Sequence, residues 1–452
     1  MMRILWPALY SALFLFQLAV HGCGTSDDLE DLVDDPSQRS KVACDVLPDS
    51  GYEVVPEFSD QATLEVVDCG LAFPSRMAIT PDGEFLLVAQ LRGVIEVFQR
   101  TSNGFEAAVT PLHDLGDLDV EDEAGLTGMF FGVDFDLDAE QEERRDLFVT
   151  FQRDEDDRGI NIIRRLTLER TANGLSATAP VDIIRFPEAT GQAHQIQNGV
   201  GLMVEDQPHI LVAVGDANRF RNARDPTTSP GTLQLLKRDG SSPAGDRPWP
   251  EAPSTHAIGV RNVYGFVLLP STVDARPTIV AYENGNTETD RGWLIRLFPE
   301  SGPPAQLDLG NVGDDDADSW LAFEDLHTRA ALGGGRTAVF DTISPPRAPT
   351  EVAYHPGGGP IPESVAGAAS FVVAMFGESG TTTLSPGKGL ELVSVTNIGG
   401  AALQSDRRLL VRRRAETEGQ FRHPVPLAVD PVTGDIYLAD IITGELSRLT
   451  FP

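Results

Sequence analysis

Two ten-residue segments near opposite ends of the chain share one pattern: residues 80–89 (TPDGEFLLVA) and residues 430–439 (DPVTGDIYLA). Each copy places a Pro/Asp/Gly turn before a short apolar strand, and a second glycine turn, at Gly93 or Gly444, precedes another strand. Such a unit is typical of the outer half of a propeller blade. A copy at each end predicts that the first and last blades are alike and that the ring closes between them.

The same pattern continues between these two segments. Apolar stretches alternate with Gly, Pro, Asp and Asn, and the 452 residues include 43 glycines and 32 prolines, as many short connected strands require. No long helical periodicity and no linker between separate cores is visible. We therefore predict an all-β fold, a single six-bladed β-propeller over residues 44–452. Blades are expected to begin near residues 67, 120, 178, 254, 347 and 405, with a long loop or insertion at residues 300–345.

The first 43 residues read differently. Arg3 precedes an apolar run at residues 4–20, and the sequence VHGC at residues 20–23 is similar to a bacterial lipobox. This predicts a lipoprotein-type signal peptide at residues 1–22 and lipidation of Cys23, with a plain signal peptide or an uncleaved anchor as alternatives. Residues 23–43 carry a dense acidic run and are expected to form a flexible, solvated tether that holds the domain off a membrane.

Charge and cysteine content narrow the choice of partners. The net charge of −33 repels phosphate backbones, so nucleic-acid binding is not expected. If Cys23 is lipidated, Cys44 and Cys69 remain in an exported chain. We predict one disulfide between them, which would pin the N-terminal segment onto the first blade.

Several short phrases then occur in a definite order. They are GLTG at 125–128, VGD at 214–216, KRDGS at 237–241, GVRNVYGF at 259–266, ENG at 283–285, APTEVAY at 348–354 and HPV at 423–425. Over roughly residues 67–452, this order resembles that of the soluble glucose/sorbosone dehydrogenases. These are six-bladed quinoproteins that use pyrroloquinoline quinone (PQQ) and calcium. The resemblance implies a small sugar or alcohol as substrate and a separate electron acceptor.

PQQ carries several carboxylates and an ortho-quinone, so its site needs cations, a metal ion and a base for the substrate hydroxyl. By resemblance, Arg261 and Asn262 match the Arg-Asn pair that binds the cofactor, although an inter-blade salt bridge is the alternative. The resemblance also implies calcium ligation by backbone carbonyls of Gly285 and Asn286. Glu283 would order that loop, or would be an ordinary solvated carboxylate.

The catalytic histidine of the family has no direct counterpart. Aligning its phrase on residues 198–202 places Gln197 at that position, and glutamine cannot act as a base. His194 lies three residues earlier and takes the role if the loop is longer here. An ordinary loop histidine is the alternative.

The cations that the family places near its cofactor also change. Glu378 stands where the resemblance implies a cation. Lys388 is a possible substitute, with an ordinary solvated lysine as the alternative. In the last blade the cation is kept only if Arg422 or protonated His423 supplies it.

Three functions follow from these observations. The first is an exported, membrane-tethered dehydrogenase that oxidises an aldose or related alcohol with PQQ and calcium. The second is a propeller that has lost this chemistry and binds a carbohydrate or protein at the cell surface. The third is a hydrolytic propeller with calcium and no PQQ. The first function requires a base and several cations around the channel, whereas the second does not.

Overall fold

The structure is a computed structural model. It describes residues 47, 49–116, 118, 120, 124–155, 158–172, 174–187, 194–217, 222–243, 251–275, 277–284, 290–297, 337–377, 388–398, 403–414 and 422–452. The predicted signal peptide and acidic tether lie outside these ranges, as does most of the predicted insertion at residues 300–345.

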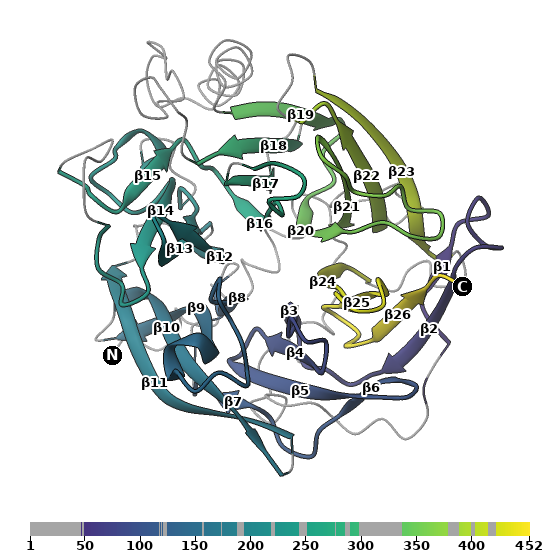
Figure 1. The fold of residues 1–452 in the computed structure, drawn as a ribbon, viewed down its shortest axis with the longest axis horizontal. Coiled ribbons are helices and arrows are strands. Elements are labelled where there is room, and N and C mark those ends of the chain that lie inside the picture. The colour runs from purple at the N-terminus through teal and green to yellow at the C-terminus, as the bar shows by residue number, and fades with distance from the viewer. Residues whose placement is uncertain are drawn as a thin grey trace, which may run out of the picture.

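Six antiparallel sheets stand around a central axis (Figure 1). The first contains β3 (Pro74–Ile79), β4 (Phe85–Gln90), β5 (Val94–Thr101), β6 (Gly104–Ala107) and β7 (His113–Asp114). The second contains β8 (Leu126–Phe131), β9 (Asp146–Glu155), β10 (Arg158–Thr171) and β11 (Gly174–Pro187). The third contains β12 (Ile196–Val204), β13 (Gln207–Val214), β14 (Thr232–Lys237) and β15 (Thr255–Ile258).

The remaining three sheets follow in chain order. The fourth contains β16 (Val263–Leu268), β17 (Thr278–Glu283), β18 (Asp290–Arg296) and β19 (Thr337–Ile343). The fifth contains β20 (Pro349–His355), β21 (Ala368–Met375), β22 (Gly389–Thr396), β23 (Gln404–Arg413) and β1 (Tyr52–Val54). The sixth contains β24 (Pro424–Val429), β25 (Ile436–Asp440), β26 (Leu446–Thr450) and β2 (Thr63–Asp68). Two short 3-10 helices, η1 (Glu142–Arg145) and η2 (Asn222–Arg224), lie in connecting loops. The predicted all-β, six-bladed propeller is confirmed.

The innermost strands set the position of the site. β3, β8, β12, β16, β20 and β24 contact one another in a closed cycle around the axis (Figure 1). We call the end of the ring at which these six strands begin the upper rim. Because the sheets are antiparallel, the turn after the second strand of each blade lies at this rim too: Ile196 pairs with Val214, and Val263 pairs with Glu283.

The second strands of the blades are apolar on both faces because each sheet packs between two neighbours. All six residues of β4 are buried, and the same holds for β17. Their side chains belong to cores that lie between successive sheets, such as the cluster that joins Leu87 of β4 to Val149 of β9. This explains why the central strands read as continuous apolar runs rather than as alternating ones.

Two details of the predicted blade pattern need correction. The repeated segments supply β4 with β5 and β25 with β26, which are the second and third strands of their sheets, not the outer half of a blade. The predicted blade starts at 67, 178, 254 and 405 fall in or directly before β2, β11, β15 and β23, which are outer strands of preceding sheets. An outer strand and the next inner strand are both short and bounded by turns, so the sequence pattern does not reveal which sheet each joins.

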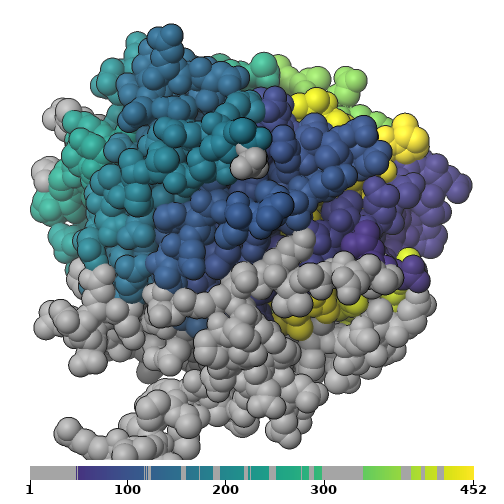
Figure 2. Space-filling view, turned by 90° about the horizontal axis from the view of Figure 1, so that it is seen from below, coloured from purple at the N-terminus to yellow at the C-terminus, as the bar shows by residue number. Residues whose placement is uncertain are grey.

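The two ends of the chain meet in the sixth sheet. β2 pairs with β26, with Thr63 opposite Thr450 and Asp68 opposite Leu446, so an N-terminal strand completes the C-terminal blade. Figure 2 shows the N-terminal residues, in purple, beside the C-terminal ones, in yellow. β1 adds to the fifth sheet by pairing with β23.

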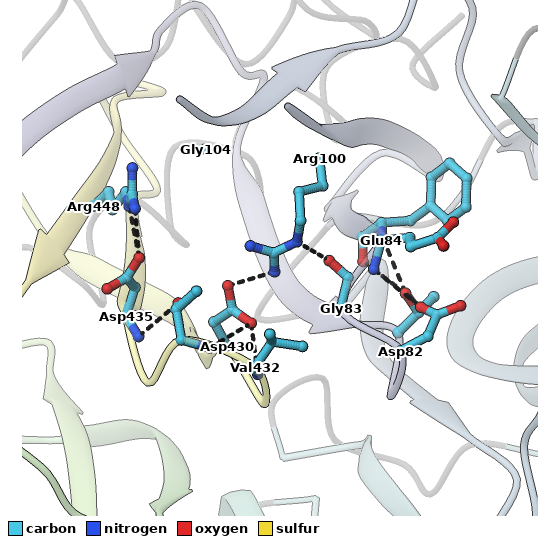
Figure 3. A network of polar contacts seen from close by, with 12 residues as sticks. Asp82, Gly83, Glu84, Arg100, Gly104, Asp430, Val432, Asp435 and Arg448 are labelled. Atoms are coloured by element: carbon cyan, nitrogen blue, oxygen red, sulfur yellow. Dashed lines mark hydrogen bonds and ion pairs between the residues drawn. The ribbon is translucent and has the colours of Figure 1, made fainter. Parts of the chain in front are cut away.

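A polar network joins the first and sixth blades at the opposite, lower rim (Figure 3). The guanidinium of Arg100 lies 2.5 Å from a carboxylate oxygen of Asp430 and also donates to the carbonyl of Gly83. Arg448 lies 2.6 Å from Asp435 and donates to the carbonyl of Asn103 at 3.0 Å. Each arginine therefore bonds to both blades.

We expect Arg100→Ala to lower the free energy of unfolding by about 2 kcal/mol, because the fully buried carboxylate of Asp430 loses its counter-ion. Urea unfolding measures this change. Arg170→Ala is the matched control: Arg170 joins the first two blades through pairs with Asp82 and Glu84 that are 34% and 49% exposed, and its loss should cost less than about 1 kcal/mol. Equal losses would show that the Arg100 pair contributes nothing particular to closure.

Candidate functional site

The predicted site residues that the structure describes lie together at the upper rim. Five of them lie just before an inner strand: His194 before β12, Arg261 and Asn262 before β16, and Arg422 and His423 before β24. Gln197 is the second residue of β12, and Glu283 is the last residue of β17. The fold thus brings together side chains that the sequence spreads over 230 positions.

His194 is paired with a buried carboxylate. Its Nδ1 lies 2.9 Å from Oδ1 of Asp216, and the two side chains are 7% and 0% exposed. A carboxylate accepts hydrogen bonds only, so this contact places the ring proton of neutral His194 on Nδ1. Nε2 then carries the lone pair that can accept a proton, as in other histidine–carboxylate pairs.

The backbone fixes this pair in place. Asp216 lies in the turn after β13, and the amide of Ala217 donates to the carbonyl of His194 at 3.2 Å. A Cβ atom added at Gly215 would lie 2.3 Å from that same carbonyl, so only glycine fits. His194 itself has a φ of 56°, in the left-handed region. The VGD phrase therefore supplies both the partner of His194 and the close backbone approach that positions it.

Arg261 and Asn262 are linked to the same turn. The amide of Asp216 donates to the carbonyl of Arg261 at 2.9 Å. The amide of Arg261 donates to Oε1 of Glu283 at 2.7 Å, and Nε1 of Trp293 donates to Oε2 at 3.0 Å. Both carboxylate oxygens of Glu283 thus accept hydrogen bonds within the fourth blade. Gly285 and Asn286, the predicted calcium-binding carbonyls, lie outside the described residues.

The loop after β17 also holds the Arg261 side chain. Nη1 of Arg261 donates to the carbonyl of Asn284, and the amide of Asn284 donates to the carbonyl of Asn262 at 2.9 Å. The guanidinium is only partly buried. These contacts orient a permanently charged group at the upper rim, between the turn that carries Asp216 and the loop that follows Glu283.

Gln197 is buried in a different way. Its side chain is 0% exposed, and no described residue donates to or accepts from either amide atom. Its backbone carbonyl accepts from Oγ1 of Thr150 at 2.6 Å, which fixes the strand at this point. Burying an amide without partners costs about 1–3 kcal/mol per polar group, so such a group requires an explanation.

The two candidate cations of the last blade have other roles. Arg422 pairs with Glu445 at 2.6 Å, so its charge is neutralised inside the protein. The ring of His423 stacks on Phe376, with centroids 3.9 Å apart, and Nδ1 lies 2.9 Å from the Phe376 carbonyl. Burial, and to a smaller extent the charge of Lys388, lowers the pKa of His423 to about 3. The prediction that protonated His423 supplies a cation is therefore wrong at neutral pH.

Lys388 lies near this stacked pair. A Cβ atom at Gly377 would approach Cγ of Lys388 to 2.3 Å, so the lysine stem packs on the segment that directly follows β21 at the upper rim. Lys388 thus remains a candidate cation. Glu378 lies outside the described residues.

Sequence reasoning missed one central pair, Arg76 and Glu351. Arg76 is the largest fully buried side chain among the described residues. Its Nη1 lies 2.7 Å from Oε2 of Glu351 and 3.0 Å from the carbonyl of Thr350. The same guanidinium donates to the carbonyls of Thr127 and Tyr264. Arg76 of β3 therefore contacts β8, β16 and β20, just below the upper rim.

Arg76 reaches across the ring of inner strands below the candidate site. Each acceptor of Arg76 is a second or third residue of an inner strand, at the same level as Gln197 in β12. The guanidinium also lies 4.7 Å from the centre of the Tyr264 ring. In sequence, Arg76 is one charged residue in PSRMAI, and nothing there indicates a position on the axis.

Two further observations bear on the predicted ligands and partners. Among the described residues, no three His, Cys, Asp or Glu side chains are grouped as a metal site would need. No helix in the described part of the chain is long and apolar enough to cross a bilayer. Cys69 is disulfide-bonded, but Cys23 and Cys44 lie outside the described residues. The pairing of Cys69 with Cys44 and the lipidation of Cys23 stay predictions.

The fold and the upper rim define a six-bladed propeller with a buried histidine–carboxylate pair at one mouth of its channel. The family model described as "Glucose / Sorbosone dehydrogenase" matches residues 71–296, half of the chain. The chain belongs to this family. A search of curated proteins found no significant match.

Solved structures of similar fold include three sugar dehydrogenases. The PQQ-bound aldose sugar dehydrogenase of Streptomyces coelicolor is 18% identical, with a TM-score of 0.57 over 87% of this chain and 99% of that one. The soluble aldose sugar dehydrogenase of Escherichia coli, in its apo form, is 16% identical, with a TM-score of 0.58 over 86% and 100%. The PQQ domain of Coprinopsis cinerea pyranose dehydrogenase, in its holo form, is 14% identical, with a TM-score of 0.56 over 90% and 99%. These similarities establish the fold.

Proposed function

We propose that this protein is a PQQ-dependent dehydrogenase that oxidises an aldose or a related alcohol at the upper rim of the propeller. The observation that carries the proposal is the buried contact between His194 and Asp216. It supports His194 as the general base, since Gln197 cannot take that role. Family membership supports the cofactor and the sugar substrate.

His194 acts as the general base. Its Nε2 takes the proton of the substrate hydroxyl as a hydride leaves the adjacent carbon, and Asp216 stabilises the resulting imidazolium. PQQ, when bound, supplies the two-electron acceptor for that hydride. The substrate thereby loses one proton and one hydride, and a separate acceptor must later remove the two electrons from the protein.

The side chains at the rim fit an anionic quinone. Arg261 offers a forked, permanent cation to a carboxylate, and Asn262 accompanies it from the same segment. The buried amide of Gln197, which has no partner among the described residues, offers an NH2 donor group and an oxygen acceptor to a bound polar group. Arg422 is neutralised by Glu445 and is therefore not proposed as a cofactor contact.

Calcium is part of the proposal. Backbone carbonyls of Gly285 and Asn286 would bind it, since Ca²⁺ prefers oxygen ligands and tolerates carbonyls. The hydrogen bonds of Glu283 to Arg261 and Trp293 support this arrangement, because they hold the start of the same loop.

We also propose that the chain is exported and anchored through lipidated Cys23. The disulfide at Cys69 supports export, because disulfides persist in oxidising compartments. The proposed mature chain is thus a lipoprotein that faces the periplasm or the cell surface.

The proposed cofactor binding can be tested with a soluble form of the protein that begins at residue 36. This form is titrated with PQQ in the presence and absence of calcium. We expect calcium-dependent binding, and we expect Arg261→Ala to weaken it at least about tenfold, because one charged hydrogen bond contributes about 1.5–3 kcal/mol. Cofactor absorbance reports the binding. Arg170→Ala, a substitution between the first two blades, should leave the affinity unchanged. No binding at high micromolar PQQ would refute the dehydrogenase and favour a non-catalytic propeller that binds a carbohydrate or protein.

A further inference from the structure

We propose that the upper rim, with the mouth of the candidate site, faces the membrane to which the chain is anchored. This orientation rests on the proposed lipid anchor at Cys23 but not on the proposed catalytic activity. It follows from where the N-terminal segment leaves the propeller.

The direction of β1 gives the exit point. Tyr52 pairs with Arg413, the last residue of β23, and Val54 pairs with Val411. The end of β23 leads through residues 414–423 to the start of β24, which lies at the upper rim by definition. Because β1 is antiparallel to β23, its first residue lies at that rim, and the chain before Tyr52 leaves there.

Buried hydrogen bonds hold this exit in place. Oγ of Ser50 donates to Oε1 of Glu445 at 2.6 Å, and the amide of Gly51 donates to Oε2 at 3.1 Å. The hydroxyl of Tyr52 donates to Asp440 at 2.6 Å. Asp440 and Glu445 flank the turn between β25 and β26, and the amide of Ile441 in that turn donates to the carbonyl of His423 at 3.0 Å. The exit therefore adjoins the predicted site residues.

The segment also packs closely against Arg422 at Gly51. A Cβ atom at Gly51 would lie 2.0 Å from Cζ of Arg422, which is itself held by Glu445. Arg422 thus fixes the N-terminal segment at the rim. This gives a structural role to a residue that the sequence suggested for the cofactor.

A disulfide fixes a second point at the same rim. Cys69 directly follows β2, and Asp68 pairs with Leu446, the first residue of β26, beside the turn described above. The other two cysteines of the chain are Cys23 and Cys44, so the partner of Cys69 lies upstream of residue 47. Thioether linkage to a lipid uses the sulfur of Cys23, which leaves Cys44.

The length of the remaining tether favours one orientation. Cys44 lies 21 residues after Cys23; an uncharged coil of that length would span about 25 Å on average, and charge repulsion lengthens it. The six-residue inner strands alone rise about 20 Å, before their loops are added. With the lower rim toward the bilayer, this tether would also have to run the whole height of the propeller, a length that the upper-rim orientation does not require.

The negative charge of the tether keeps the upper rim at a distance from the bilayer surface. Its acidic residues are Asp27, Asp28, Glu30, Asp31, Asp34 and Asp35. They repel one another and the anionic headgroups of the lipid, so a hydrated gap separates the mouth from the bilayer. A small polar substrate reaches the mouth through this gap.

Fluorescence quenching in vesicles tests the orientation. Thr443→Cys labels the upper rim and Val432→Cys the lower rim of the same sheet, at the two ends of β25; both side chains are exposed. Acylated Cys23 and the disulfide leave no other free thiol. With the full lipoprotein in vesicles that carry nitroxide-labelled headgroups, we expect the fluorophore at position 443 to be quenched at least twice as strongly as that at 432.

Inserting a flexible segment of about 40 residues after Asp35 is the control, and it should bring the two values together. Equal quenching with the native tether, or stronger quenching at 432, would overturn the orientation. A mature chain that does not associate with vesicles would overturn the anchor and the orientation together. Neither result would affect sugar oxidation by the soluble form. Failure of the proposed orientation can therefore be distinguished from failure of the proposed dehydrogenase activity.

Discussion

Replacing His194 with alanine is expected to lower kcat/KM for an aldose about 10³-fold, within the range that a positioned general base contributes. The imidazole lies 2.9 Å from Asp216, and a water molecule in the space left by alanine is a far weaker base than this ring. PQQ affinity should change little, because the proposed cofactor contacts come from Arg261 and its neighbours. Steady-state kinetics with a dye as acceptor, and a separate PQQ titration, measure the two effects.

Asp216→Asn distinguishes a base from a merely structural histidine. An asparagine amide has nearly the same shape but can donate a hydrogen bond to Nδ1, which favours the tautomer with its proton on Nε2. The variant should fold normally and still lose activity by at least about 100-fold. Added imidazole should partly restore the activity of His194→Ala. If His194→Ala retained more than a tenth of the wild-type kcat/KM, another group would have to be the base.

The sequence predicted the propeller because its signals are local and repeated. Turn residues such as Gly83 and Gly434, each with a positive φ, recur before apolar strands, and the number of such units indicated six blades. Blade boundaries were less predictable. An outer strand such as β11 or β23 has the same short apolar pattern as the inner strand that follows it, and only hydrogen-bond pairing assigns each strand to its sheet.

For the candidate site, the sequence predicted which residues belong to it but not how they are paired or charged. His194 and Arg261 carry chemistry that the sequence displays, but the partner of His194 lies 22 residues away, across the turn of β13. The neutralisation of Arg422 by Glu445 and the uncharged state of His423 depend on burial, which the sequence does not show. The pairing of Arg76 with Glu351 spans 275 positions and exists only because the ring closes.

Arg76→Ala is expected to cost more stability than any other single substitution considered, about 3–5 kcal/mol at neutral pH. The change leaves the carboxylate of Glu351, 7% exposed, without its counter-ion and removes the contacts of Arg76 with three other inner strands. Urea unfolding at pH 7.5 measures the loss. Replacing both partners by apolar residues, Arg76→Met with Glu351→Leu, should recover most of it, because no charge then remains buried.

The pH dependence of this loss gives a sharper test. Burial raises the pKa of Glu351 even beside Arg76, whose charge opposes the shift. Without Arg76 the pKa rises further, so the folded variant holds a proton at pH values where the unfolded chain has released it. A raised carboxyl pKa makes stability fall as pH increases from the unfolded value of about 4.3. Arg76→Ala should therefore cost least near pH 4.5 and most near pH 7.5. A loss below about 1 kcal/mol at pH 7.5, or a loss independent of pH, would show that the pair does not hold the inner strands together.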